Sequence, residues 1–458
     1  MARVAIVGAG ITGLALAYRL REKRPDIDLA LFEAASRAGG NIGTIREDGF
    51  QFDTGPNGFL DNKPFAMQLC RDLGLGDELV PGSESSRRHR FLFLNGKLQA
   101  LPSGPLSLLK TPLLSFRGKV ALIGELFRAR GADEKDESVA EFFRRRIGNE
   151  ATQVFIDALV TGIHGGDPEL LSMRAAFPRI RQMEQEHGSV IRGFLKAAEL
   201  RKREAKSRGE AYRPQQMWSF RQGLGRLPEM LFEHLGNILA CNRAVSRIER
   251  SGDLYRLHFA DGRVEVADTL VLSCPAYRQA EILAPFDREL ATELAGIAYT
   301  AIAVVSVVYR QQDVTGAPAG FGYIAPQRQR RDVLGVQWCS SIFPERAPPG
   351  FVNWRALCGG WHRRDILDWP DERLAQAVDD ELAAALGVRA SPVRRRITRW
   401  RRAIPQYFVG HQKRVERIET LAARHPGLIL TGNAFHGVAI NDCIEQAEKI
   451  AARISSNR

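Results

Sequence analysis

The feature that most constrains this chain is a glycine-rich turn between two strand-like segments near its N-terminus. Residues 3–7 are mostly apolar, and Gly8-Ala9-Gly10-Ile11-Thr12-Gly13 follows them directly. Residues 14–22 carry apolar side chains at helical spacing, and residues 28–32 form a second apolar run that ends at Glu33. The pattern predicts a strand, a helix and a second strand, with G-x-G-x-x-G in the first turn.

Each residue type in this turn suits a bound dinucleotide. Gly8 allows the tight turn, Gly10 lets the backbone approach a pyrophosphate, and Gly13 lets the helix pack close to the strand. The helix N-terminus offers N–H groups and the positive end of its dipole to phosphates. Glu33 stands about twenty residues after Gly13, where a carboxylate accepts hydrogen bonds from a ribose diol.

Composition narrows the class of protein. A chain of 458 residues exceeds one compact core, so two or three domains are expected. No apolar run has the length of a membrane span, and the predicted strand close to Met1 leaves no room for a signal peptide. The six cysteines show no C-x-x-C spacing, which favours free thiols in a reducing cytoplasm and no metal site.

The balance of charge is basic, with a net charge of +12 and a pI near 9.6. The positive residues are not grouped into a basic motif interleaved with aromatic residues, so nucleic acid is not the expected partner. An anionic membrane surface or an acidic substrate fits better. Residues 101–130 combine short apolar blocks with lysine and arginine, and two interpretations stay open: a segment in the bilayer interface, or helices that pack internally.

The remaining pattern predicts a mixed α/β chain. Helices are expected over 64–73, 138–146, 149–160 and 195–208, and strands over 87–94, 245–250, 255–259, 264–266, 267–275, 301–309, 333–338 and 351–358. Residues 428–434 are expected to form a strand and then a turn, with a final helix to the C-terminus. Asn95-Gly96 predicts a hairpin turn after 87–94. Residues 161–168 predict a glycine-rich break, in which His164 is expected to be a loop histidine rather than a metal ligand.

The run from Glu33 to Asn41 has the form E-x-x-x-R-x-G-G. It resembles the extended fingerprint of flavin-dependent amine oxidases, phytoene desaturases and protoporphyrinogen oxidases, which indicates FAD rather than a nicotinamide. More particular stretches make the chain similar to the oxygen-dependent protoporphyrinogen oxidase family over nearly its whole length. These stretches are 90–93, 101–102, 136–138, 161–163, 177–178, 184–187, 320–322, 342–344, 404–407, 410–411 and 437–444.

The resemblance implies an α/β fold with three parts. A discontinuous Rossmann-like FAD domain would comprise 1–62, 218–290 and 404–458, a mixed α/β substrate domain 63–90, 194–217 and 291–403, and an inserted helical membrane-associating domain 91–193. It also implies noncovalent FAD, held by Gly8, Ala9, Gly10, Ile11, Thr12, Gly13, Glu33, Ala34, Arg37, Gly40, Asn41, Gly55, Pro56, Asn57, Gly58, Val245, Gly432, Asn433, Val438, Ala439 and Ile440.

For the substrate, the resemblance implies that Arg90 pairs with a propionate and that the backbone carbonyl of Gly162 faces the ring. Ile324 and Phe343, with Phe321 nearby, would enclose the tetrapyrrole. The implied reaction is oxidation of protoporphyrinogen IX to protoporphyrin IX in heme synthesis: a bridging methylene gives a hydride to the flavin, and O2 accepts the electrons and forms H2O2. The chemistry lies in the cofactor, and the protein supplies position and a dry pocket.

The implied setting is the cytoplasm, with peripheral contact at the inner face of the cell membrane. Transfer of porphyrin to a ferrochelatase is expected, and a homodimer is compatible with the sequence.

Three alternative functions stay open. Coproporphyrinogen III, with four propionates, would be favoured by further basic residues near Arg90, such as Arg87 and Arg88. The second alternative is an amine oxidase or a carotenoid desaturase; flavin attachment of the monoamine oxidase type would need a cysteine near 431–435, and Cys443 lies too far on. A flavin-bound scaffold without turnover would keep the same fingerprint.

Overall fold

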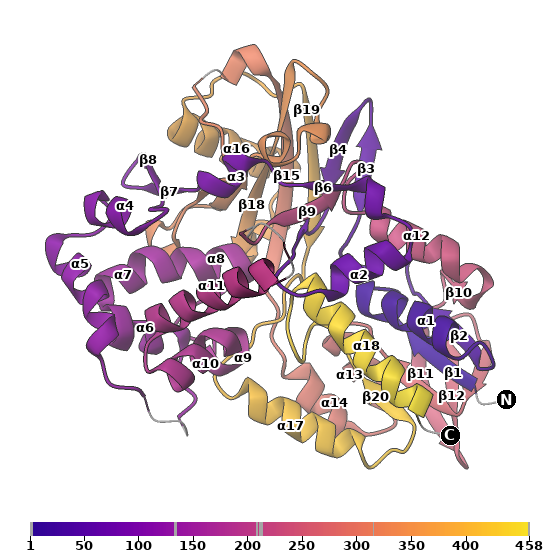
Figure 1. The fold of residues 1–458 in the computed structure, drawn as a ribbon. Coiled ribbons are helices and arrows are strands. Elements are labelled where there is room, and N and C mark those ends of the chain that lie inside the picture. The colour runs from indigo at the N-terminus through magenta and orange to yellow at the C-terminus, as the bar shows by residue number, and fades with distance from the viewer. Residues whose placement is uncertain (1–2, 132–134, 208, 210–213, 315, 457–458) are drawn as a thin grey trace. The chain divides into compact units, whose positions relative to one another are not determined.

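A computed structural model describes residues 3–131, 135–207, 209, 214–314 and 316–456 (Figure 1). The chain forms two compact units, each assembled from separate segments. The first contains Met1–Pro81, Met217–Ala298 and Lys413–Arg458, and the second contains Gly82–Gln216 and Tyr299–Gln412.

The first unit is built on a five-stranded parallel sheet in the order β10-β2-β1-β14-β20. Its strands are β1 (Arg3–Val7), β2 (Asp28–Phe32), β10 (Leu239–Ala240), β14 (Thr269–Leu272) and β20 (Leu428–Leu430). β1 lies between β2 and β14 and is almost entirely buried, which explains its uninterrupted apolar run. The predicted first strand, second strand and final strand are thereby confirmed.

Helices and a small antiparallel sheet complete the first unit. α1 (Ile11–Lys23) packs against α18 (Ile440–Ser456) and α12 (Arg226–Leu235), and α18 also contacts α2 (Phe65–Asp72), as Figure 1 shows. The predicted meander is present as β11 (Val245–Ser251), β12 (Leu254–Phe259) and β13 (Val264–Ala267). The other elements are β3 (Thr44–Glu47), β4 (Phe50–Asp53), β5 (Phe59–Leu60), β6 (Leu79–Pro81), β9 (Met217–Phe220), α13 (Ala276–Leu283) and α14 (Arg288–Ala295). α17 (His411–Ala422) runs from the end of the second unit into the first.

The second unit is built on a seven-stranded sheet in the order β19-β15-β18-β17-β16-β7-β8. Its strands are β7 (Phe91–Leu94), β8 (Lys97–Ala100), β15 (Ala301–Arg310), β16 (Gly322–Ile324), β17 (Val333–Gln337), β18 (Phe351–Gly360) and β19 (Arg394–Trp400). One face carries an apolar core that includes residues of α16 (Asp371–Leu386). The β7–β8 hairpin belongs to this sheet although it falls in the predicted helical segment 91–193.

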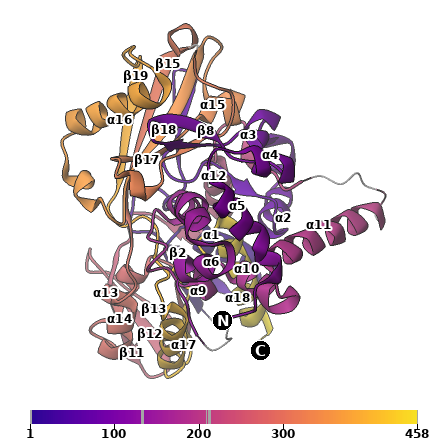
Figure 2. The ribbon, with the colours of Figure 1, turned by 90° about the vertical axis from the view of Figure 1, so that its left-hand side faces the viewer.

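The helices of the second unit follow the β7–β8 hairpin in the chain. They are α4 (Pro105–Lys110), α5 (Phe116–Ile123), α6 (Val139–Ile147), α7 (Asn149–Ala151), α8 (Asp157–His164), α9 (Met173–Ala176), α10 (Pro178–His187) and α11 (Val190–Ser207). In Figure 2, α4 and α5 face the viewer and α11 extends to one side. Short helices α3 (Glu84–Arg88) and α15 (Cys339–Ile342) flank the sheet strands in sequence.

Several predicted boundaries are wrong. Arg87 and Arg88 end the helix α3, and the strand begins only at Phe91. A π-helical turn at residues 152–156 joins α7 to α8, and the helix continues to His164, so residues 161–164 are not part of a loop. The helix predicted over 195–208 begins at Val190, and its last predicted residue lies outside the described residues. The strand β19 was not predicted, because its arginines conceal the alternating pattern.

The two-unit division does not separate the predicted helical domain from the predicted substrate domain. The whole of the predicted helical domain and most of the predicted substrate domain fall in the second unit, but residues 63–81 and 291–298 of the predicted substrate domain fall in the first. The predicted FAD segments 1–62 and 218–290 also fall within the first unit. Among the described helices, none has the length and apolar character that crossing a bilayer requires.

Candidate functional site

The three glycines of the first turn have different surroundings. A Cβ on Gly13 would lie 2.0 Å from the Gly8 carbonyl oxygen, and Gly8 itself has a φ of +104°. These two positions therefore require glycine for packing and backbone conformation. A Cβ on Gly10 would meet nothing within 4 Å. Gly10 thus borders free space at the start of α1.

The N-terminus of α1 is open to an anion. Gly10 is the N-cap residue, no side chain caps the helix, and its first turn contains no acidic residue. Its N–H groups and dipole therefore favour a phosphate. Ile11 and Thr12 contribute this first turn, and their side chains are buried.

Glu33 is fixed beside the glycine turn. Its Oε2 accepts a hydrogen bond from the Ala9 N–H at 2.7 Å, and its Oε1 accepts one from the Ala35 N–H at 2.9 Å. Each carboxylate oxygen keeps a second lone pair for a ribose hydroxyl. Ala34 is exposed next to it.

Arg37 acts on the backbone of the following loop. Its guanidinium donates to the carbonyls of Ala38 at 3.1 Å, Ile42 at 3.0 Å and Gly40 at 2.8 Å. The Gly39 N–H donates to the Ala9 carbonyl at 2.7 Å, which ties this loop to the first turn. In this structure Arg37 therefore shapes the loop that presents Gly40 and Asn41.

A second loop, residues 55–58, packs against the first. A Cβ on Gly55 would lie 1.9 Å from the Asn41 carbonyl oxygen, and one on Gly58 would lie 2.6 Å from the Trp218 carbonyl oxygen. Between them, after Pro56, Asn57 is 3% exposed, and its Nδ2 has no hydrogen-bond partner among the described residues. A buried, unpaired amide is costly unless a ligand satisfies it.

The remaining predicted cofactor residues lie in the meander and near the C-terminus. Val245 opens β11, where the register with β12 shifts. Gly432 has a φ of +124° and is followed by Asn433. Val438 and Ala439 precede α18, and the side chain of Ile440 is buried in the core.

Sequence reasoning missed a charged cluster at the start of α18. Asp442 Oδ2 accepts from the Ala439 N–H at 3.3 Å, and Lys63 Nζ lies 2.6 Å from Asp442 and 2.7 Å from Glu445. Lys63 thus compensates two carboxylates at a helix N-terminus that the sequence assigned to the flavin. Nothing in the local sequence around Lys63 indicates this contact, which spans most of the chain.

Every predicted cofactor residue lies in the first unit. The free space at Gly10, the uncapped helix, the fixed carboxylate of Glu33 and the unpaired amide of Asn57 fit FAD. Every predicted substrate residue lies in the second unit.

Arg90 and Phe321 are in contact within the second unit. The guanidinium carbon of Arg90 lies 4.8 Å from the centroid of the Phe321 ring, a cation–π distance. The Phe321 N–H donates to the His89 carbonyl at 2.9 Å, which fixes the two segments together. Burial lowers the pKa of Arg90, but an arginine keeps its charge at neutral pH.

Gly162 and Ile324 form a second contact. A Cβ on Gly162 would lie 2.6 Å from Cδ1 of Ile324, so glycine is required for this close approach. Gly162 lies in the last turn of α8, and no donor among the described residues bonds to its carbonyl. Helices leave their last carbonyls unbonded, so this oxygen is available to a ligand.

Phe343 differs from the other predicted substrate residues. Its side chain is fully buried, and the guanidinium carbon of Arg346 lies 4.9 Å from its ring centroid. In this structure Phe343 therefore has no surface to offer a ring, and the role that the resemblance implies for it stays a prediction.

His164 ends α8 and is 2% exposed, with its ring edge-to-face on Phe177 at 5.6 Å. Burial lowers its pKa to about 4, so the imidazole is neutral at physiological pH. Within the described residues no group of three or more His, Cys, Asp and Glu side chains could hold a metal ion.

Comparisons with known proteins agree on one family. The family model described as flavin-containing amine oxidoreductase matches residues 11–455. Protoporphyrinogen oxidase 1 of Arabidopsis thaliana chloroplasts is 34% identical over 98% of this chain and 87% of its own length. Coproporphyrinogen III oxidase of Bacillus subtilis is 30% identical over 97% of this chain and 96% of its own. A crystal structure from Exiguobacterium sp. 255-15, provisionally assigned as a protoporphyrinogen oxidase, has a TM-score of 0.86 and 28% identity, and the match covers 100% of this chain and 99% of that one.

Proposed function

Because the chain belongs to the family of flavin-containing amine oxidoreductases, we propose that it oxidises a porphyrinogen, and that this substrate is protoporphyrinogen IX. As a family member the chain is an oxidoreductase with FAD as its cofactor. The proposed product is protoporphyrin IX, with O2 as the electron acceptor. Relatives with porphyrinogen oxidase names match the chain over nearly its whole length, which supports the substrate class.

The observation that carries the proposal is the pair of contacts Arg90–Phe321 and Gly162–Ile324, which lie at the paired strands β7 and β16. β7 and β16 pair in parallel, with Leu92 opposite Ile324, so Arg90 precedes the same strand region that presents Ile324. A cation beside an aromatic ring, followed by an apolar side chain and a free carbonyl, suits a flat apolar ligand that bears a carboxylate. FAD supplies the hydride-accepting chemistry when bound.

The protein's own residues would bind and orient the substrate. The Arg90 guanidinium has the fork geometry that binds a carboxylate through two parallel hydrogen bonds, and its contact with Phe321 holds the plane of the fork. Ile324 would press against the ring, and the Gly162 carbonyl would accept a hydrogen bond from a pyrrole N–H. Positioning of this kind is the main catalytic contribution expected of the protein.

Coproporphyrinogen III is the second candidate. Relatives with that name match the chain as completely as the protoporphyrinogen oxidases do. Arg87 and Arg88, the basic residues closest to Arg90 in sequence, both contact Glu84, at 3.5 Å and 2.5 Å. One carboxylate shared by two arginines leaves a net positive charge on α3, which would favour the substrate with more propionates.

The test is a comparison of substrates with the purified, FAD-loaded protein. We would measure kcat/KM in air for protoporphyrinogen IX and coproporphyrinogen III through the fluorescence of the porphyrin formed. A clear preference for the first supports the proposal, and a clear preference for the second replaces the substrate. No turnover of either compound, with bound flavin that neither compound bleaches, would contradict porphyrinogen oxidation and favour a scaffold.

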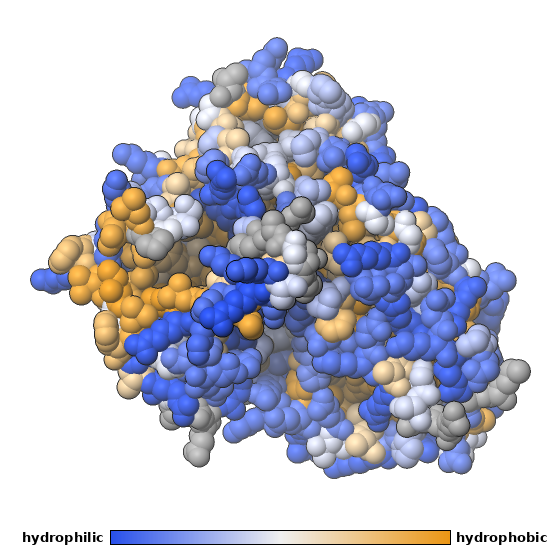
Figure 3. Space-filling view, viewed as in Figure 1, coloured by the Kyte–Doolittle hydropathy of each residue, from blue (hydrophilic) through white to orange (hydrophobic). Residues whose placement is uncertain are grey.

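We also propose peripheral contact with the inner face of the cell membrane, through α4, α5 and the short helix η2 (Gly124–Phe127). This surface exposes several large apolar side chains, and Figure 3 shows orange surface at the left, where α4 and α5 lie in Figure 1. Transfer of the porphyrin to a ferrochelatase and a homodimer remain predictions from the resemblance.

A further inference from the structure

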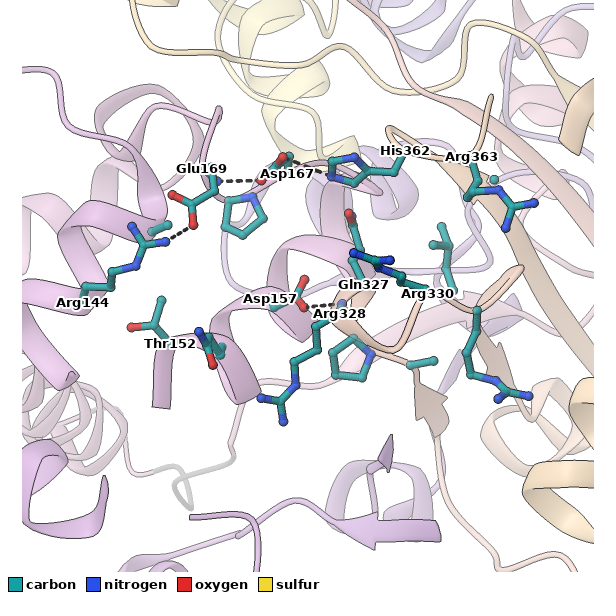
Figure 4. Close-up of a pocket in the computed structure, with 18 residues that line it drawn as sticks. Arg144, Thr152, Asp157, Asp167, Glu169, Gln327, Arg328, Arg330, His362 and Arg363 are labelled. Carbon is teal, nitrogen blue, oxygen red and sulfur yellow. Dashed lines mark hydrogen bonds and ion pairs between the residues drawn. The ribbon is translucent and has the colours of Figure 1, made fainter. Parts of the chain in front are cut away.

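The second unit contains a cavity of about 660 Å³ that none of the predicted substrate residues lines. Figure 4 shows its walls: α6 and the α7–α8 helix lie on one side, and the turn between β16 and β17 with the start of the segment after β18 lies on the other. The volume lies within the range of sites for small organic ligands. The cavity is therefore large enough for a ligand of its own.

Most of the basic side chains around this cavity are paired with carboxylates. Arg144 pairs with Glu169, Arg331 with Glu381 and Arg363 with Asp332. His362 Nε2 lies 3.1 Å from Asp167.

Arg328 and Arg330 differ from these basic residues. Both are exposed, and neither has an ion-pair partner in the part of the chain that the structure describes. Their guanidinium donors are therefore not held by a carboxylate among the described residues, although the carboxylates of Asp157 and Asp167 also line the cavity.

The turn that carries these two arginines is held in place. The Arg328 N–H donates to Oδ2 of Asp157 at 3.2 Å, and the Gln327 side-chain amide donates to the Gly166 carbonyl. Arg330 has a φ of +50°, a left-handed conformation that is unusual for a residue other than glycine. The backbone of the turn is thus fixed to α8 and to the segment after it, so the two guanidinium groups start from defined positions.

The wall between the charged groups is apolar. The apolar residues that line the cavity include Ala140, Pro168, Ala325 and Leu334. Ala325 directly follows Ile324, the last residue of β16. Charged residues make up about half of the lining, so the cavity suits an organic ligand that has both apolar surface and charged groups. Arginine is the residue best suited to carboxylates.

We propose that this cavity is a second binding site for a carboxylated porphyrin, separate from the site at Arg90 and Gly162. The proposal rests on the proposed function, because the ligand is the oxidised product of that reaction. Arg328 and Arg330 bind its carboxylates, and the apolar wall contacts its ring. A porphyrin with four carboxylates binds more tightly than one with two.

The test uses the FAD-loaded protein and the fluorescence of coproporphyrin III and protoporphyrin IX. Titration at low ionic strength is expected to show two classes of site for each porphyrin. In the double variant Arg328→Ala/Arg330→Ala, the Kd of one class of site is expected to rise about tenfold, the effect of losing two exposed charged contacts, and the other class is expected to be unchanged. Arg90→Ala loses the other class. The double variant Arg179→Ala/Arg310→Ala removes the same charge from exposed arginines elsewhere in the unit and serves as the control.

Two results would overturn the inference. One is binding to Arg328→Ala/Arg330→Ala that equals binding to the control variant, since porphyrin would then not use the cavity. The other is a second class that pyrophosphate occupies as tightly as coproporphyrin III does, since the cavity would then bind small anions without a ring. Failure of the proposed function appears separately, as a lack of porphyrinogen turnover in the unaltered protein, and does not depend on these titrations.

Discussion

At the scale of single residues, Gly10 and Gly13, the second and third glycines of the motif G-x-G-x-x-G, offer a matched pair of tests. Gly13→Ala would place a Cβ 2.0 Å from the Gly8 carbonyl, whereas Gly10→Ala would fill free space at the helix N-terminus. We expect Gly13→Ala to lower the thermal stability of the FAD-free protein. Gly10→Ala should leave that stability unchanged but weaken FAD binding by about tenfold or more, roughly 1.4 kcal/mol.

The measurements are the melting temperature of FAD-free protein and the Kd of FAD from quenching of flavin fluorescence. The Gly10 backbone has φ −71° and ψ 176°, which alanine adopts without strain, so folding of that variant is expected. Unchanged FAD affinity in Gly10→Ala would show that the pyrophosphate does not approach the backbone there.

Arg90 is the residue on which the substrate proposal depends most directly. Loss of a charge-assisted contact with a propionate is worth about 1.5–3 kcal/mol, so Arg90→Ala should raise KM for protoporphyrinogen IX about tenfold to a hundredfold. Arg90→Lys should restore part of the affinity, because lysine keeps the charge without the planar fork. Arg179→Ala, exposed in α10, is the control. Wild-type kinetics in Arg90→Ala would remove the propionate role.

How far individual residues could be predicted depends on whether their role is local. The glycine turn and Glu33 follow from spacing along the chain, and the structure places them together. The role of Arg37 in holding carbonyls of its own loop, and the burial of Phe343, depend on packing that spacing does not encode. The sequence does not distinguish Arg328 and Arg330 from other surface residues, because two arginines in a polar turn resemble an ordinary solvated surface.

At the scale of elements, some of the segments that carry the family resemblance hold other parts of the fold together. Asp136 accepts hydrogen bonds from the Ser172 hydroxyl at 2.5 Å and from the Gly410 N–H at 2.7 Å, so it joins three distant segments of the second unit. Glu137 and Glu184 belong to a buried cluster of charges around α6. The sequence predicts the elements well where apolar residues mark them clearly, as in β1, β15 and α6, whereas α10, which carries charges of the buried cluster, was not predicted.

The buried cluster has its centre at Arg146, which is fully buried. Arg146 pairs with Glu125 and lies 3.3 Å from Glu184, and Glu125 also accepts from the Ser189 hydroxyl at 2.5 Å and the Val190 N–H at 2.9 Å. Burial acts to raise the pKa of Glu125, but the hydrogen bonds from Ser189 and Arg146 outweigh it, and the pKa is lowered. The pKa of Glu184 is also lowered, where burial is outweighed chiefly by hydrogen bonds from Arg145.

Breaking this cluster should destabilise the second unit. Removing one partner of a buried ion pair costs about 3–5 kcal/mol, so Glu125→Gln should lower the melting temperature by several degrees at pH 7. The matched control is Glu199→Gln on α11, whose exposed pair with Arg203 at 2.6 Å should contribute less than about 1 kcal/mol. Equal effects of the two substitutions would show that the cluster does not stabilise the fold.

The cluster also predicts a pH dependence. Because the pKa values of Glu125 and Glu184 are lower in the folded protein than in the unfolded chain, their stabilisation is complete above the ordinary glutamate value of about 4.3. It is lost as the pH falls below that value and through the lower folded pKa values. Melting temperatures measured from pH 7 to pH 3 should therefore fall more steeply below about pH 4.3 in the wild type than in Glu125→Gln.

At the scale of the whole molecule, the predicted FAD residues and the predicted substrate residues fall in different units, each built from separate segments of the chain. The residues predicted for FAD come from all three segments of the first unit, and those predicted for the substrate come from both segments of the second. The sequence could predict the FAD segments because strand, turn and helix recur there in a known order. It could not predict that the β7–β8 hairpin belongs to the sheet of the second unit, since the hairpin joins that sheet through the pairing of β7 with β16, which lies more than two hundred residues later.

The two interpretations of residues 101–130 apply to different residues of the same segment. Leu113 and Leu114 are buried in an apolar cluster with residues of β7 and the α7–α8 helix, so internal packing accounts for them. It does not account for the exposed apolar side chains Leu106, Leu109, Phe116, Val120, Ile123 and Phe127, of which Phe116 is 81% and Phe127 83% exposed. Exposed Lys110 and Arg117 accompany them. Apolar side chains with basic neighbours are typical of a surface that lies in an anionic bilayer interface.

The membrane proposal predicts how this surface responds to substitution and salt. Phe116→Ser/Phe127→Ser should reduce co-sedimentation with vesicles that contain phosphatidylglycerol by about tenfold or more, because burial of each phenylalanine contributes roughly 1.5–3 kcal/mol. Phe232→Ser/Leu254→Ser, which removes exposed apolar residues from the first unit, is the control and should bind as the wild type does. Added salt should weaken binding of the wild type, since Lys110 and Arg117 act through screened charges. Equal binding by the two double variants would mean that the exposed phenylalanines of α5 and η2 do not enter the bilayer, and the net charge of +12 alone would then account for any attraction to the vesicles.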